Sequence, residues 1–221
     1  MTADSPTPKA QSPIPPLNAI VDVDASVRAG WRPLDVVKAF LAGGARFLQL
    51  RAKSAGGEEL LDLAAAIVEL ASPEGADLIV NDRADVARLA GAAGVHVGQD
   101  DLSPHDVRMI IGDHASVGLS THTVEQVGRA LDQPVSYLAI GPVFGSVTKS
   151  SGYDRVGLVM VGEAARRARG RSLPLVAIGG ITLFTAPSVI DAGADAVAVI
   201  GDLLTTGNPE SRVRDYLRAL A

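Results

Sequence analysis

The stretches VNDRAD (residues 80–85) and GVHVGQDD (residues 94–101) each begin as a short apolar strand and end abruptly in carboxylates and amides. This pattern is typical of parallel barrels, in which buried strands deliver polar groups to one rim. Neighbouring parallel strands lie about 4.8 Å apart, so side chains from two adjacent strand ends can reach one ion. The two stretches therefore predict a rim at which Asp82 and Asp101 share a metal.

The composition describes one domain with a core of small aliphatic side chains, since 47% of the 221 residues are hydrophobic and 23 are glycine. No apolar run reaches the roughly 18–20 residues that cross a bilayer, and the N-terminus lacks the apolar centre of a signal peptide. We therefore expect a cytoplasmic protein with no membrane partner. The net charge of −5 argues against a nucleic-acid partner.

The chain contains no cysteine, so a metal site must use oxygen or imidazole ligands. Hard cations such as Mg²⁺ are the natural candidates for Asp82 and Asp101. The alternative is structural, because an Asn-Asp or Asp-Asp pair after a strand is also typical of a turn or a helix cap.

Residues 1–17 contain five prolines among small polar residues and are expected to form a flexible tail. From residue 18 to 221, strand-like and helical runs alternate, as in an α/β domain. Eight strands are predicted near Ala19–Val23, Ala45–Arg51, Leu78–Val80, Val95–Val97, Ser116–Leu119, Ser136–Ile140, Leu175–Ile178 and Ala196–Ile200. Helices are predicted over Glu58–Ala71, near Gly157, and over Pro209–Leu220, and Gly94 is expected to form a left-handed helix cap.

Eight such units with short links predict a single eightfold (β/α) TIM barrel with parallel strands, and an open doubly wound sheet is the alternative. In the second strand, FLQLRAK (residues 47–53), the period of two places Gln49, Arg51 and Lys53 on the face opposite the leucines. An inward Arg51 is costly without a partner, which favours an anion at the barrel mouth. An internal Arg–Asp salt bridge that closes the mouth is the alternative.

The sixth strand leads into GPVFGSVTK (residues 141–149), where Ser146 and Thr148 offer hydroxyls and Lys149 could meet a departing diphosphate. Glycines after the seventh and eighth strands let backbone amides approach a phosphate monoester, which we expect at Gly180, Ile200 and Gly201. Two anion sites would then face each other across one barrel mouth. Such a site is suited to joining two phosphorylated molecules.

Six motifs occur in order along the chain: QLRAK at 49–53, NDRAD at 81–85, GVHVGQDD at 94–101, STH at 120–122, GPVF…TK at 141–149 and AIGGI at 177–181. With them the chain resembles the thiamine-phosphate synthase family from about residue 18 to 203. The resemblance implies an eightfold barrel and a Mg²⁺-dependent transferase. This enzyme couples a hydroxymethylpyrimidine diphosphate with a thiazole phosphate to give thiamine phosphate and diphosphate.

The resemblance also implies roles for individual residues. The pyrimidine diphosphate would be held by Gln49, Arg51, Lys53, Asn81, Ser120 and Lys149, and Mg²⁺ by Asp82 and Asp101. The thiazole phosphate would contact Ser146 and Thr148, with its phosphoryl group on the amides of Gly180, Ile200 and Gly201. Arg51, Ser120 and Lys149 are the expected catalytic residues. The chain departs from the family at Gly145-Ser146, where Pro-Thr is common, and at Gly201, where serine is common.

Two other functions stay open at this point. A thiazole tautomerase shares the barrel and moves a proton, for which His122 could serve as acid or base, although a histidine at a helix start is as often structural. A phosphate-binding barrel without catalysis is the other alternative. The acidic pair and Lys149 favour the synthase. His96, His105 and His114 are assigned to structure or solvent, and the sequence leaves open the oligomeric state and whether the thiazole carries a carboxylate.

Overall fold

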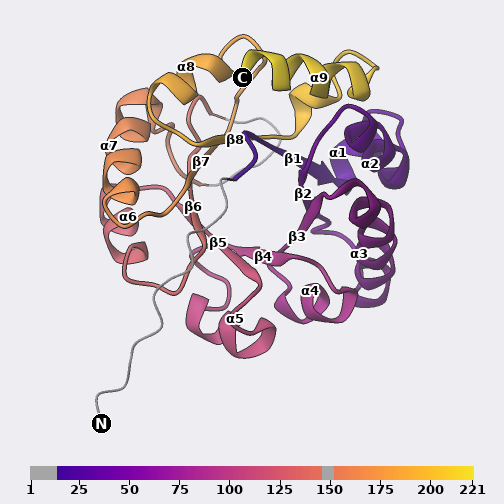
Figure 1. Ribbon diagram of the computed structural model, residues 1–221, viewed down its shortest axis with the longest axis horizontal. Coiled ribbons are helices and arrows are strands. Elements are labelled where there is room, and N and C mark those ends of the chain that lie inside the picture. Colours follow the sequence, from indigo (N-terminus) through magenta and orange to yellow (C-terminus); the bar gives the residue numbers. More distant parts are fainter. Residues whose placement is uncertain (1–13, 146–151) are drawn as a thin grey trace.

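The computed structural model describes residues 14–145 and 152–221 of the chain. Eight parallel strands form a closed barrel in which each strand pairs with its neighbours in sequence and β8 pairs with β1 (Figure 1). The strands are β1 (Leu17–Asp22), β2 (Phe47–Arg51), β3 (Asp77–Asn81), β4 (Gly94–Val97), β5 (Ser116–Thr121), β6 (Tyr137–Ile140), β7 (Leu175–Ile178) and β8 (Ala196–Val199). The predicted eightfold barrel is confirmed, and the open sheet is excluded because the β8–β1 pairing leaves no edge.

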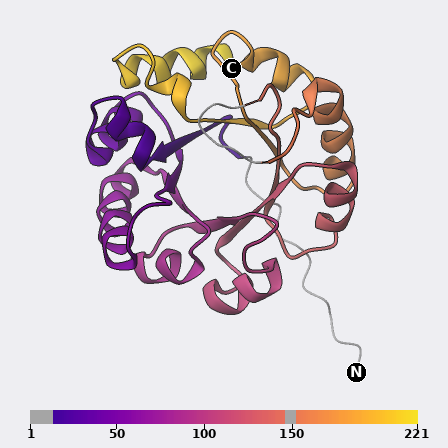
Figure 2. The same cartoon turned by 180° about the vertical axis from the view of Figure 1, so that it is seen from behind.

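Helices surround the barrel on its outside, as Figure 1 and Figure 2 show from opposite sides. They are α1 (Val23–Arg28), α2 (Pro33–Ala42), α3 (Gly57–Ala71), α4 (Ala84–Ala90), α5 (Pro104–Ile111), α6 (Val124–Ala130), α7 (Gly157–Arg169), α8 (Ala186–Asp191) and α9 (Pro209–Ala219). Two 3₁₀ turns, η1 (Ser72–Glu74) and η2 (Gly201–Leu203), follow α3 and β8. Helices at the three predicted places are confirmed, whereas the short helix α1 is not among the predicted elements.

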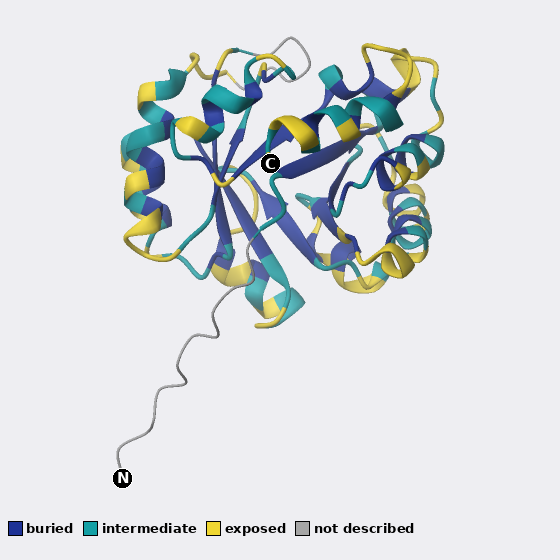
Figure 3. Cartoon of the chain, turned by 45° about the horizontal axis from the view of Figure 1, so that its top comes forward, coloured by how far each residue is buried: buried dark blue, intermediate teal, exposed yellow. Residues whose placement is uncertain are grey.

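Burial follows the periodicity of the sequence (Figure 3). On α3 the buried residues recur every three to four positions, at Leu60, Ala64, Ile67 and Ala71, so one side of the helix faces the strands. On β2, Leu48 and Leu50 are fully buried in the layer between strands and helices. The alternate positions, Gln49 and Arg51, line a cavity inside the barrel, as the period of two predicts.

The strand ends differ from the prediction where a cap or turn intervenes. Strand β1 ends at Asp22 because this residue caps α1, its Oδ1 accepting a hydrogen bond from the Ala25 amide at 2.8 Å. Strand β8 ends at Val199 because Ile200, with ψ of −86°, leaves the extended conformation and starts η2.

Among the helices of the described residues, none is long and apolar enough to cross a membrane. The cytoplasmic location stays a prediction, as does the division into a tail over 1–17 and a barrel over 18–221.

Gly94, at the start of β4, is required by close packing and not by a left-handed backbone. The prediction of a helix cap here is wrong, because the left-handed cap of α4 is Gly91, with φ of +68°. A Cβ on Gly94 would lie 2.1 Å from the carbonyl oxygen of Ser116 on the neighbouring strand β5. Because that atom belongs to the backbone of the barrel, it cannot turn away as a side chain would.

We expect Gly94→Ala to lower the free energy of unfolding by about 1–3 kcal/mol, the usual cost of overpacking. Urea denaturation measures the change. The matched control is Gly128→Ala in α6, where the nearest atom to a new Cβ is 3.9 Å away, and which should stabilise the helix by up to about 1 kcal/mol. Equal effects of both substitutions would contradict the packing explanation.

Candidate active site

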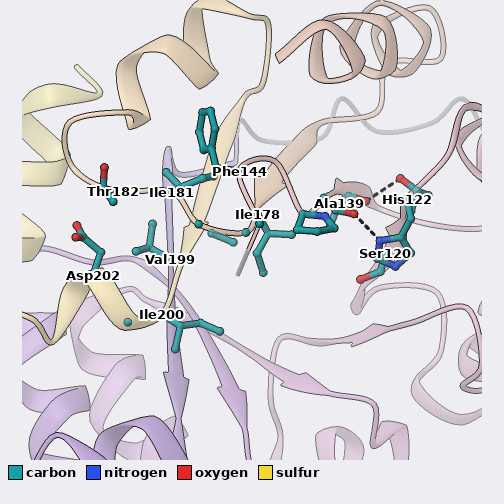
Figure 4. A pocket seen from close by; sticks show the side chains of 18 of the residues that line it. Ser120, His122, Ala139, Phe144, Ile178, Ile181, Thr182, Val199, Ile200 and Asp202 are labelled. Carbon is teal, nitrogen blue, oxygen red and sulfur yellow. Dashed lines mark hydrogen bonds between the residues drawn. The ribbon is translucent and has the colours of Figure 1, made fainter. Parts of the chain in front are cut away.

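A pocket lies at the carboxyl ends of strands β5 to β8, where barrels of this kind place their chemistry. It has a volume of about 610 Å³. In Figure 4, Ser120 and His122 lie on one side, while Phe144, Ile181 and Asp202 come from the loops after β6, β7 and β8. The walls are mainly apolar side chains and glycine backbone, which suits a small organic ligand with few polar contacts.

A second, smaller cavity of about 20 Å³ lies in the barrel interior and shares five lining residues with the first, including Ser120 and Ile200. Its polar lining comes from six different strands: Asn18, Gln49, Arg51, Asn81, His96, Ser120 and Tyr137. Four residues predicted to hold a diphosphate, Gln49, Arg51, Asn81 and Ser120, are thus brought together.

Arg51 forms an ion pair with Asp22, whose side chain is only 2% exposed. The two residues lie directly opposite each other in the β1–β2 ladder. The internal Arg–Asp salt bridge considered as an alternative is therefore present. Nevertheless, Nε of Arg51 is buried and has no hydrogen-bond partner. A buried N–H without an acceptor is costly, so Arg51 keeps a donor for an anionic ligand while Asp22 holds its Nη1.

The predicted metal ligands, Asp82 and Asp101, lie close enough for Asp101 to affect the pKa of Asp82. Burial raises the pKa of Asp82 above its usual range, and the neighbouring carboxylate of Asp101 adds to this, while Lys53 opposes it. Lys53 forms an ion pair with Asp82, and Oδ2 of Asp101 accepts a hydrogen bond from the Gly98 amide at 2.7 Å. Nowhere in 14–145 or 152–221 do three or more His, Cys, Asp or Glu side chains gather to hold a metal.

The backbone of Asp82 is also unusual. It is one of two non-glycine residues in the described ranges with positive φ, at 65°, and its amide donates to the carbonyl of His96 at 2.7 Å. This conformation is uncommon outside glycine, asparagine and aspartate. It belongs to a turn between β3 and α4, so the structural explanation for the NDR sequence holds, and the metal role of Asp82 stays a prediction.

The glycine turns after β7 and β8 form the opposite side of the pocket. Gly179 and Gly180 have φ of +105° and +65°, and a Cβ on Gly180 would lie 2.0 Å from the carbonyl of Gly145. Ile200 and Gly201 lie where β8 passes into η2. The three predicted phosphate residues therefore line one pocket wall, with glycine backbone that a ligand can approach closely.

Asp202 ties these turns together. Its Oδ2 accepts hydrogen bonds from the Tyr216 hydroxyl at 2.6 Å, the Arg212 Nη2 at 2.7 Å and the Leu183 amide at 3.0 Å. Leu183 follows the β7 turn, Asp202 follows β8, and the other two donors belong to α9. One carboxylate thus links both glycine turns to the same helix.

His122 lines the pocket between β5 and α6. Its Nδ1–H donates to the carbonyl of Gly141 at 2.5 Å, and its ring stacks on Tyr153 with centroids 3.9 Å apart. The amide of His122 also donates to Oε1 of Gln126, whose Nε2 donates to the Tyr153 hydroxyl at 3.3 Å. These contacts orient the ring whether or not it takes part in chemistry.

Ser146, Thr148 and Lys149 lie outside the described residues. Conversely, the sequence did not single out Asp22, Tyr137 or Asp202, and it assigned His96 to structure or solvent. The sequence does contain a signal for His96. In GVHV it lies between two valines, and the period of two places it on the opposite face of β4 from them, toward the barrel interior.

Comparisons with known proteins identify the family of the chain and agree with its fold. The family model described as thiamine monophosphate synthase matches residues 17–203. The chain belongs to this family. It is 43% identical to the thiamine-phosphate synthase of Roseiflexus sp. (strain RS-1), covering 96% of this chain and 91% of the relative. It is 44% identical to the thiamine-phosphate synthase of Koribacter versatilis (strain Ellin345), covering 94% and 96% respectively.

Among solved structures, the thiamine phosphate pyrophosphorylase from Pyrococcus furiosus superposes with a TM-score of 0.83 at 25% identity, covering 93% of this chain and 95% of that chain. The family resemblance stated from the motifs is confirmed. As a member of the thiamine monophosphate synthase family, the protein is an enzyme of the transferase class.

Asp202→Asn should weaken the link between the glycine turns and α9. We expect a loss of about 1.5–3 kcal/mol in the free energy of unfolding, because hydrogen bonds to a partly buried charged group are lost. Chemical denaturation measures it. The matched control is Asp215→Asn on α9, whose exposed pair with Arg218 at 3.3 Å should contribute less than about 1 kcal/mol. Equal losses would contradict the role of Asp202.

Asp82→Asn should stabilise the metal-free protein in EDTA at pH 7. Since the pKa of Asp82 is raised in the folded state, folding favours the protonated form. Ionisation of Asp82 therefore lowers the free energy of unfolding as the pH rises above the ordinary aspartate pKa of about 3.9, and the loss is complete above the folded-state pKa. Asparagine tolerates the positive φ equally well. Denaturation midpoints between pH 4 and 8 should show a gain that grows with pH.

The control for this prediction is Asp85, whose pKa is shifted in the opposite direction. Arg83 lowers the pKa of Asp85 to about 2, so Asp85 stabilises the folded state above pH 3.9 and Asp85→Asn should not stabilise it. A loss of stability for Asp82→Asn across the whole pH range would refute the explanation by burial.

Proposed function

We propose that the protein is a thiamine-phosphate synthase. It would join 4-amino-5-hydroxymethyl-2-methylpyrimidine diphosphate to 4-methyl-5-(2-phosphooxyethyl)thiazole and release diphosphate. The observation that carries the proposal is the arrangement of two unlike groups of residues at one barrel mouth. Arg51, Lys53 and the acidic pair lie at or just after the ends of β2 to β4, and glycine backbone lies opposite, after β7 and β8.

The two cations of the first site differ in how they would receive a diphosphate. Lys53 is 51% exposed and paired with Asp82, and such exposed pairs contribute little, so Lys53 can exchange its partner for a phosphate oxygen. Arg51 is 15% exposed and held by buried Asp22. It would keep that ion pair and use its unpartnered Nε. Gln49 and Asn81, which line the same cavity, would contact the pyrimidine part.

Asp82 and Asp101 fit Mg²⁺ by the chemistry of their donors, since this ion commonly takes one or two carboxylates together with waters and substrate phosphates. When bound, Mg²⁺ would supply positive charge against the diphosphate. Burial, with a smaller contribution from Asp101, raises the pKa of Asp82, and a bound cation would favour the carboxylate form in this environment.

In the proposed reaction the bond between the pyrimidine methylene and the diphosphate oxygen breaks, and its electron pair leaves with diphosphate. The aminopyrimidine ring spreads the positive charge that develops at the methylene. The thiazole nitrogen then supplies the electron pair of the new C–N bond. Residues that hold the leaving group, Arg51, Ser120 and Lys149, would bind it more tightly as its charge increases, which lowers the barrier.

The thiazole phosphate would be held by the amides of Gly180, Ile200 and Gly201, with Ser146 and Thr148 on its other side. Fixing this phosphate places the thiazole nitrogen within reach of the methylene, so the second step needs no further encounter. Because Gly201 offers an amide and no hydroxyl, this phosphate would depend on backbone donors at that position.

Lys149→Ala should lower kcat by a hundredfold or more, equivalent to about 3–4 kcal/mol of transition-state stabilisation. Binding of the pyrimidine diphosphate should weaken much less. Single-turnover rates and equilibrium binding separate the two effects. A loss confined to affinity would show that Lys149 only binds the substrate.

The decisive experiment incubates the purified protein with both substrates, in Mg²⁺ or in EDTA, and follows thiamine phosphate and diphosphate together. Equal amounts of both products, formed only with Mg²⁺, are the expected result.

Asp101→Asn should raise the Mg²⁺ concentration needed for half-maximal rate at least tenfold. Asp100→Asn, the same change one residue earlier, is the control and should leave that concentration within about twofold, since ordinary surface changes are small.

Binding of the thiazole phosphate without product would refute the synthase. Proton exchange on the thiazole in that case would identify a tautomerase, for which the pair of Asp82 and Asp101 has no task. Binding alone would identify a barrel that holds phosphates without catalysis.

A further inference from the structure

Three buried polar side chains, Tyr137, His96 and Ser120, form a continuous line in the barrel interior, and a fourth, Gln49 on β2, lines the same cavity. The line begins at the hydroxyl of Tyr137 on β6. That hydroxyl contacts Nδ1 of His96 at 3.1 Å, and Nε2 of His96 contacts Oγ of Ser120 at 2.8 Å. All four side chains are at most 7% exposed. The line ends at Ser120, which lines the large pocket.

The barrel makes room for this line with a glycine in the middle of a strand. Gly118 on β5 lies directly opposite His96 on one side and Tyr137 on the other. A Cβ at this position would lie 2.2 Å from Cζ of Tyr137 and 2.4 Å from Nδ1 of His96. The two rings therefore meet over Gly118, with centroids 5.6 Å apart. Glycine weakens a strand interior, so its presence here indicates that this position is kept small to let the two rings meet.

The line can run in two directions, and they present Ser120 differently. If Tyr137 donates to Nδ1 of His96, the proton of the neutral imidazole is on Nε2, which donates to Ser120 and leaves the serine O–H for the pocket. If Nδ1–H donates to Tyr137 instead, Nε2 accepts the serine proton. Ser120 then offers only lone pairs to a ligand. The hydrogen bond at one ring nitrogen thus determines what the other nitrogen does.

We propose that Tyr137 and His96 are positioning residues that hold the Ser120 hydroxyl as a hydrogen-bond donor to the diphosphate, through the Nε2–H form of His96. This inference rests on the proposed function, which places an anion at Ser120. An anion favours this direction because lone pairs aimed at phosphate oxygens would repel them, whereas an O–H donor binds them strongly.

The surroundings of Tyr137 and Ser120 are compatible with this direction. Burial raises the pKa of Tyr137 well above its usual value, so the phenol has a proton that it can donate to His96. Gln49 can serve the remaining acceptor site of the phenol oxygen through its NH₂ group. The backbone of Ser120 is also anchored, because its carbonyl accepts a hydrogen bond from Nε2 of Gln99 at 2.7 Å. Gln99 thus holds the backbone of Ser120, and His96 holds its hydroxyl.

The first test reads the proton position directly. The chain has four histidines, so ¹⁵N-histidine labelling gives few signals, and His96→Gln assigns one of them. The tautomer is measured by ¹⁵N–¹H correlation NMR in the wild-type protein with MgCl₂ and inorganic diphosphate. The expected result is His96 protonated at Nε2 and not at Nδ1. Protonation at Nδ1 in this complex would overturn the proposal.

The second test is a double-mutant cycle that separates positioning from general stability. Tyr137→Phe removes only the hydroxyl. It keeps the ring and its edge-to-face contact with Phe47, in which the ring centroids lie 5.7 Å apart. We expect a roughly tenfold lower kcat, as for loss of one directed donor, with the KM for the thiazole phosphate unchanged. In the Ser120→Ala background the same substitution should have almost no further effect on kcat, because the two residues act through one contact.

If the loss of kcat in the double variant equals the sum of the two single losses on the free-energy scale, the proposal is overturned, since Tyr137 then acts independently of Ser120. If the wild-type protein makes no thiamine phosphate, the proposed function fails. If it does and Tyr137→Phe leaves kcat intact, the proposed function stands and the positioning role alone is wrong.

Discussion

Hydrogen bonding between β8 and β1 is the constraint on which the rest of this structure depends. The register joins Leu17 to Val197 and Ala19 to Val199, and it converts a row of parallel strands into a closed barrel. Closure places the turn after β8 only two strands from Arg51 on β2, a separation of about 10 Å at the usual strand spacing. Arg51 and Gly201, which lie 150 residues apart in sequence, thus face one mouth because the sheet has no edge.

Within that mouth, local carboxylates control the cations of a protein whose net charge is −5. Asp22 caps α1 and holds Arg51, Asp82 pairs with Lys53, and Asp202 holds Arg212. Since charges at physiological salt are screened over about 8 Å, the site responds to these neighbours and little to the total charge. Each carboxylate also binds or belongs to a backbone turn, so the positions of the charges follow from the fold.

Much of the fold and part of the site could be predicted because the signals are local. Alternation in FLQLRAK places Gln49 and Arg51 inside, and strands followed by carboxylates mark the rim; both depend on neighbouring residues. The sequence suggests an internal salt bridge for Arg51, but the partner Asp22 becomes evident only from the β1–β2 register. The sequence suggests no more than structure or solvent for His96, because its partner Tyr137 lies 41 residues away, on a strand that is not its neighbour. The role of Asp202 in linking the glycine turns to α9 is likewise not evident from the sequence, because its donors Arg212 and Tyr216 come from that helix.

The dependence of Asp202 on α9 also ties the pocket to the last helix of the barrel. A chain cut after residue 205 would keep all eight strands and lose Arg212 and Tyr216. The carboxylate next to the β8 turn would then lack two of the three residues that donate to its Oδ2. Loss of α9 would therefore reach the pocket wall through Asp202, although no residue of α9 is among those that line the pocket.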